Sequence, residues 1–132
     1  MDYRRQQIEE LNLGERWLGA EHAQSAYDFA LKYSATDRYG LNTDTVSSID
    51  RLEIESASVA KNWLSDRLDS VGSVQVVLNE NEVFVVQSDR FLESWQDIFM
   101  PARDDAMIIH NNSKIIVFYC HEDELEIGVR NT

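Results

Sequence analysis

Two clusters of ionisable residues in the last third of the chain have side chains suited to metal binding or acid–base chemistry. One is His121-Glu122-Asp123-Glu124 and the other is Arg103-Asp104-Asp105. An imidazole beside carboxylates can hold a divalent metal or act as a base, and paired carboxylates can share a proton. The zinc-protease pattern, however, needs a second histidine four residues after the first, and Leu125 occupies that position. The simpler interpretations are a charged turn and a solvated capping loop, so we predict no metal site.

Cys120 and Trp17 also invite a functional interpretation. Cys120 precedes His121 like a nucleophile beside its base, but neighbouring side chains on an extended strand point to opposite faces. We therefore expect Cys120 to be a small buried side chain. Trp17 stands between Gly14 and Gly19, so we expect it to be exposed, where it would be a natural anchor for a protein partner.

The chain has no recognisable catalytic or cofactor motif. It lacks a glycine-rich phosphate loop, a G-x-S-x-G elbow, a C-x-x-C pair and a dinucleotide fingerprint. The sequence therefore predicts no catalytic residue and no cofactor, and it favours a non-catalytic protein. The candidate binding residues are Trp17, Arg103, Asp104, Asp105, His121, Glu122 and Asp123.

The elements that must position these residues change in type near Gly72. Before it, residues 20–33 and 56–71 carry apolar side chains at the three- and four-residue spacing of helices. After it, alternating patterns predict one hairpin over 73–87, a second over 106–120, and a last strand over 124–130. A short helix at 89–99 lies between the two hairpins. The predicted fold is α+β, with an antiparallel sheet of about five strands in the C-terminal half packed against N-terminal helices on one face.

The patterns of the last strands bear on how the sheet is covered. Residues 115–120 are apolar on both faces, which predicts a central strand, whereas 124–130 alternate as on an edge or half-exposed strand. Residues 34–47 are polar and predict a loop. If helices cover one face only, a loop or a second subunit must hide the other, which makes a homodimer plausible. The second hairpin also places the 101–105 loop and the 121–124 turn at one end of the sheet, where they are able to meet.

Length and charge limit the class of partner. The 132 residues fit a single domain over 1–132. With 12 basic and 24 acidic residues, the formal net charge is −12. This charge repels the nucleic-acid backbone and an anionic membrane surface, so we expect neither as a partner. A basic protein is a physically suitable partner.

Compartment is predicted from the same sequence. There is one cysteine, so no disulfide forms within the chain. The N-terminal residues lack the apolar core of a signal peptide. The longest apolar run, 115–120, is far shorter than the ~20 residues of a membrane helix. We therefore expect a soluble cytoplasmic protein.

Three functional hypotheses remain open. The first is a non-catalytic binding protein whose acidic face engages a basic protein; in size and charge the chain resembles small acidic bacterial inhibitor and immunity proteins, although no motif carries that resemblance. The second is a small metal-dependent or acid–base enzyme that uses the 103–105 and 121–124 clusters. The third is a housekeeping oligomer that associates only with itself.

Overall fold

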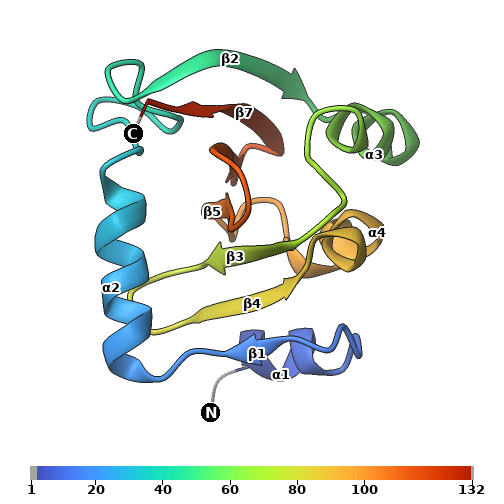
Figure 1. The fold of residues 1–132 in the computed structure, drawn as a ribbon. Helices are drawn as coiled ribbons and strands as arrows, with labels where there is room; N and C mark the ends of the chain where they lie inside the picture. Colours follow the sequence, from blue (N-terminus) through green and yellow to red (C-terminus); the bar gives the residue numbers. More distant parts are fainter. Residues whose placement is uncertain (1–2, 132) are drawn as a thin grey trace.

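The structure, a computed structural model, describes residues 3–131 and contains four helices and one seven-stranded antiparallel sheet (Figure 1). The helices are α1 (Tyr3–Glu9), α2 (Ala20–Leu31), α3 (Ala57–Ser65) and α4 (Ser88–Ile98). The strands are β1 (Arg16–Trp17), β2 (Val46–Glu53), β3 (Ser73–Val77), β4 (Val83–Gln87), β5 (Ala106–His110), β6 (Ile115–Cys120) and β7 (Glu124–Arg130). Their order in the sheet is β1-β4-β3-β5-β6-β7-β2. The predicted α+β class is confirmed, with seven strands in place of about five.

The two additional strands are the edges of the sheet and come from the N-terminal half. β1 has only two residues and pairs with β4. β2 pairs with β7 through a register shift between Ser47 and Asp50, where Ser48 has a positive φ of 54°. Such a bulge breaks the two-residue alternation by which a strand is recognised. The start of β2 was therefore predicted as part of a loop.

The two predicted hairpins and the helix between them are confirmed. β3 pairs with β4, β5 pairs with β6, and α4 connects β4 to β5. The helix buries Phe91, Trp95 and Ile98, which lie on one stripe. Phe99 then leaves helical geometry, two residues before Pro101. The chain is thereby directed back to the sheet through the 99–105 loop.

Helices cover both faces of the sheet, which corrects the expectation that they cover one (Figure 1). On one face, side chains of α1, α3 and α4 pack on residues such as Val74 and Val76 of β3. On the other face, Ala23, Ala26 and Ala30 of α2 pack over the central strands. Small alanine side chains allow the helix backbone to approach the sheet closely. This second face therefore does not need a second subunit to cover it.

β7 is an interior strand, not an edge, because it lies between β6 and β2. One consequence is that Glu126, expected on a solvated face, is only 5% exposed. Its carboxylate accepts hydrogen bonds from the Leu41 backbone N–H (2.8 Å) and from Arg38 Nη1 (2.9 Å). A buried charge needs such partners. Through these two hydrogen bonds, Glu126 holds the 32–45 segment against the face of the sheet that α2 covers.

Within residues 3–131, none of the helices has the length and apolar composition needed to span a lipid bilayer.

Candidate functional site

One end of the sheet concentrates carboxylates, because several strands start or finish there in register. Glu53 of β2 is opposite Glu124 of β7, which is opposite Cys120 of β6. At the same end, β5 begins after the 99–105 loop and the 78–82 turn joins β3 to β4. We call this region the acidic end of the sheet, and its acidic residues are Glu53, Glu80, Glu82, Asp104, Asp105, Glu122, Asp123 and Glu124.

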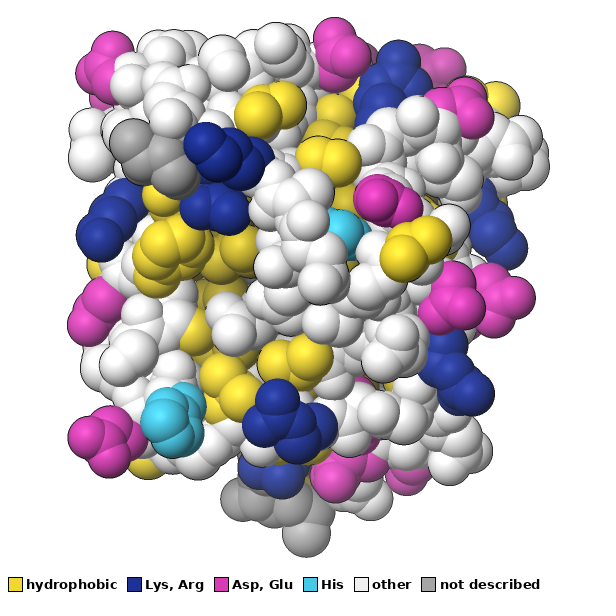
Figure 2. Space-filling view, viewed as in Figure 1, with side chains coloured by type: hydrophobic (Ala, Val, Ile, Leu, Met, Phe, Trp, Pro, Cys, Tyr) yellow, Lys and Arg dark blue, Asp and Glu magenta, His cyan; other side chains and the backbone are white. Residues whose placement is uncertain are grey.

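Arginines neutralise only part of the acidic end. Within residues 3–131, Arg4 pairs with Glu82 and Asp104, Arg103 with Asp104, and Arg51 with Glu124. The exposed Glu53, Glu80 and Glu122 have no lysine or arginine within salt-bridge distance in that part of the chain. The negative charge is not spread evenly. On the side drawn in Figure 2, Asp and Glu lie mainly at the periphery, and uncharged or apolar side chains occupy the middle.

The two sequence clusters meet through Asp105 and His121. Asp105 Oδ1 accepts a hydrogen bond from the His121 backbone N–H (2.9 Å) and lies 2.8 Å from His121 Nδ1. The loop before β5 and the turn after β6 are thereby joined, as the hairpin geometry allows. Tyr39 packs edge-on against the imidazole, with 4.7 Å between ring centres. The hydrogen bond that Asp105 accepts from the His121 ring raises the pKa of His121, since the carboxylate favours the imidazolium.

Cys120 is buried as expected, at 5% exposure, but it does not diverge from His121. β6 ends at Cys120, so the alternation of a strand no longer applies to the next residue, and Sγ lies 4.0 Å from His121 Nδ1. Burial raises the pKa of the Cys120 thiol. The same ring nitrogen faces both Asp105 and Sγ, whereas a relay needs one ring nitrogen for each partner. This geometry does not make an activated nucleophile.

The same three side chains are arranged as potential metal ligands. Asp105, Cys120 and His121 each bring one donor atom, and these atoms lie within 4.8 Å of one another. Thiolate, imidazole and carboxylate are all zinc ligands, and three protein ligands leave a fourth position open. To bind a metal, His121 Nδ1 has to give up its hydrogen bond to Asp105.

Asp104 and Arg103 have a structural role. Asp104 is 1% exposed, with Arg4 Nη2 at 2.6 Å from one oxygen and Arg103 Nη2 at 2.7 Å from the other. Its Oδ2 also accepts a hydrogen bond from the Met100 backbone N–H. Asp104 therefore links α1 to the 99–105 loop. The expectation that both aspartates face water holds for Asp105 alone.

The two remaining candidate residues of the turn after β6, Glu122 and Asp123, also differ in role. Asp123 accepts a hydrogen bond from the Tyr119 hydroxyl at 2.9 Å and has a positive φ of 61°. Burial first, and this hydrogen bond second, raise the pKa of Tyr119 above its ordinary value. Asp123 thus shapes the turn, whereas Glu122 is exposed and available for a partner.

Trp17 is not the exposed anchor that its flanking glycines predicted. It is half-buried in β1, packs on Phe84 with ring centres 4.9 Å apart, and is covered by the Arg5 guanidinium. Its indole N–H donates to Glu15. Trp17 closes the β1 edge of the sheet and lies apart from the clusters joined by Asp105 and His121.

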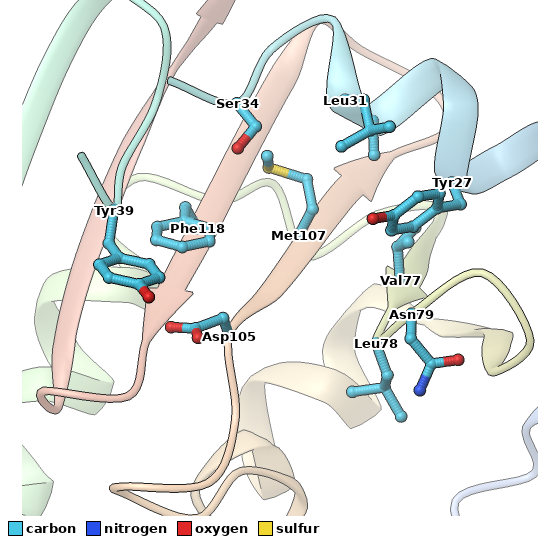
Figure 3. Close-up of a pocket in the computed structure, with 11 residues that line it drawn as sticks. Tyr27, Leu31, Ser34, Tyr39, Val77, Leu78, Asn79, Asp105, Met107 and Phe118 are labelled. Carbon is cyan, nitrogen blue, oxygen red and sulfur yellow. The ribbon is translucent and has the colours of Figure 1, made fainter. Parts of the chain in front are cut away.

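A cleft that the sequence did not predict opens beside Asp105 (Figure 3). It lies between α2 and the sheet and has a volume of about 260 Å³. Met107 and Phe118 form its floor, Tyr27 and Tyr39 stand at opposite ends, and Asp105 lies at the Tyr39 end. The lining residues come from five segments of the chain, so no local motif could have indicated the cleft. The available signal was that β5 and β6 have apolar side chains on both faces.

Comparisons with protein families, with curated proteins and with solved structures found no match to this chain.

Proposed function

We propose that this is a non-catalytic binding protein that engages a basic protein through the acidic end of the sheet, as an inhibitor or immunity-type partner does. The observation that carries the proposal is the set of exposed glutamates at this end, Glu53, Glu80 and Glu122, which form no salt bridge with a lysine or arginine of residues 3–131. Complementary charge accelerates encounter and favours basic partners over acidic ones.

A series of contacts links the loops of the acidic end to one another. The 78–82 turn shares the cleft with Asp105, and Asp105 bonds to His121. On the other side of His121, the carbonyl of Asp123 accepts the Ile54 backbone N–H, next to Glu53. The rigid strands beneath hold these loops in place. We include the cytoplasm in the proposal, since a chain with a single cysteine suits a reducing compartment.

The test is capture of partners from the source cell with two matched variants. In one, Glu53, Glu80 and Glu122 become glutamine; in the control, the exposed Glu10 and Glu93 become glutamine and Asp66 becomes asparagine. Both lose three charges, so net charge is matched. The proposal predicts a basic protein that the wild type and the control retain and the acidic-end variant loses. Equal capture by both variants would contradict it.

A second candidate function is zinc binding by Asp105, Cys120 and His121, which the 4.8 Å clustering of their donor atoms favours. A metal ion bound at this site would support the second hypothesis from the sequence, a small metal-dependent enzyme. Titration with Co²⁺ tests it, because a thiolate ligand gives an intense charge-transfer band. Cys120→Ser should abolish that band while the protein stays folded. Absence of both the band and any thermal shift with Zn²⁺ removes this candidate.

A further inference from the structure

The cleft beside Asp105 combines apolar walls with a single charged group. Met107 and Phe118 are nearly buried at its floor, whereas Leu31 and Tyr39 at the rim are 51% and 62% exposed. Figure 3 shows the Asp105 carboxylate near Phe118 and Tyr39, at the opposite end from Tyr27. An apolar channel that ends at a carboxylate matches a side chain with a long aliphatic stem and a cationic tip.

The Asp105 carboxylate is held in one orientation. Its Oδ1 faces two donors of His121, the backbone N–H and Nδ1. Among residues 3–131, no group donates a hydrogen bond to Oδ2. This oxygen is therefore available as an acceptor for an incoming cation, at the end of a cleft whose floor is apolar.

The free oxygen distinguishes between the two basic side chains. Arginine prefers both oxygens of a carboxylate for its planar fork, and here Oδ1 is already engaged. A lysine ammonium is a compact charge that needs only one strong acceptor. A second hollow of about 400 Å³, lined by residues 34–39 and Phe118, adjoins the cleft. It leaves room for the chain on either side of an inserted residue.

We propose that the cleft receives one lysine side chain of the basic partner, with its methylenes on Met107 and Phe118 and its ammonium on Asp105 Oδ2. This inference rests on the proposed function and adds its anchor point. Docking at the acidic end brings a basic surface to the cleft, since Asp105 belongs to both.

The experiment follows the methyl signal of Met107 in the full chain during titration with Nα-acetyl-lysine methylamide. The matched probe is Nα-acetyl-norleucine methylamide, which has a stem of similar length and no charge. The exposed Met100 lines none of the cleft and serves as an internal reference. The lysine probe should shift the Met107 signal in a saturable manner at millimolar concentration. The norleucine probe should have an affinity at least about fivefold lower, as expected for loss of one partly screened ion pair.

Two variants separate the charge from the apolar wall. Asp105→Asn should weaken the lysine probe about fivefold and leave the norleucine probe unchanged. Leu31→Ser, at an exposed rim position, should weaken both probes by the same factor. Asp44→Asn is the charge-matched control at an exposed position that does not line the cleft, and it should change neither.

The outcomes are distinct. Equal affinity for the two probes, or no shift of Met107 at millimolar lysine probe, overturns the lysine assignment. Shifts near Glu53 and Glu122 without a shift of Met107 also overturn it, while leaving docking at the acidic end intact. If the proposed function fails instead, the acidic-end variant captures the same proteins as the wild type. The lysine probe still shifts the Met107 signal, and its affinity still depends on Asp105.

Discussion

At the scale of single residues, the contact with Asp105 raises the pKa of His121. The folded protein raises the pKa of His121, so it binds this proton more tightly than the unfolded chain, whose ordinary value is 6.5. The pair therefore adds stability that is fully present below the unfolded pKa and is lost as the pH rises through the raised folded pKa.

Asp105→Asn should return the pKa of His121 towards its ordinary value. The amide retains an acceptor for the backbone N–H but no longer favours the imidazolium through charge. The measurement is an NMR titration of the His121 ring protons, together with urea unfolding at several pH values. Stability of the wild type should fall more steeply than that of the variant as the pH rises from below 6.5 through the raised folded pKa of His121. An unchanged His121 titration would show that Asp105 is not the cause.

Glu126 is the residue whose loss should affect the α2 face most directly. Glu126→Gln presents an amide to Arg38 and removes the charge that compensates the guanidinium. The expected loss in the free energy of unfolding is about 1–3 kcal/mol, measured by urea denaturation. Glu53→Gln is the control, since that glutamate is exposed, and it should change stability by less than about 0.5 kcal/mol. Equal effects of the two substitutions would contradict the role assigned to Glu126.

At the scale of elements, the β2–β7 pairing depends on a missing side chain. A Cβ at Gly128 would lie 2.5 Å from Val46 Cγ1 and 2.9 Å from the Ser47 carbonyl oxygen. The edge strand β2 therefore approaches β7 more closely here than a side chain would permit.

Gly128→Ala should cost about 1–3 kcal/mol of unfolding free energy, because the edge strand must move away. Gly19→Ala is the control, since a Cβ there meets nothing within 4 Å. Adding Val46→Ala to Gly128→Ala should recover part of the loss by making room. If the loss of unfolding free energy in the double variant equals or exceeds the sum of the losses in the two single variants, Val46 is not the obstacle.

The sequence predicts these elements unevenly, for identifiable reasons. The hairpins and α4 follow local patterns, so they were predicted close to their observed bounds. β1 and most of β2 are edge strands stabilised by distant partners, and two residues or a bulge leave no pattern to detect. Glu126 looked solvated because alternation identifies the face of a strand but not what covers that face. Hairpin geometry allowed the 101–105 loop and the 121–124 turn to meet but did not require the contact between Asp105 and His121. The cleft depends on α2 and the 34–39 loop, whose positions no local signal gives.

At the scale of the whole molecule, the positions of the acidic residues matter more for binding than the net charge of −12 itself. Exposed glutamates at the acidic end carry part of this charge, and a cleft with an apolar floor ends at Asp105 of the same end. Charge at a rim chiefly changes the rate of association, while a filled cleft slows dissociation. The two features therefore contribute to different rate constants.

The most direct measurement is the association rate of the captured basic partner as a function of ionic strength. For the wild type, the rate should fall steeply with added salt, since screening shortens the reach of the exposed glutamates. At low salt, the variant with glutamine at Glu53, Glu80 and Glu122 should associate about tenfold more slowly, and its rate should depend less on salt. A wild-type rate that is indifferent to salt, or one that the variant matches, would contradict docking through the acidic end.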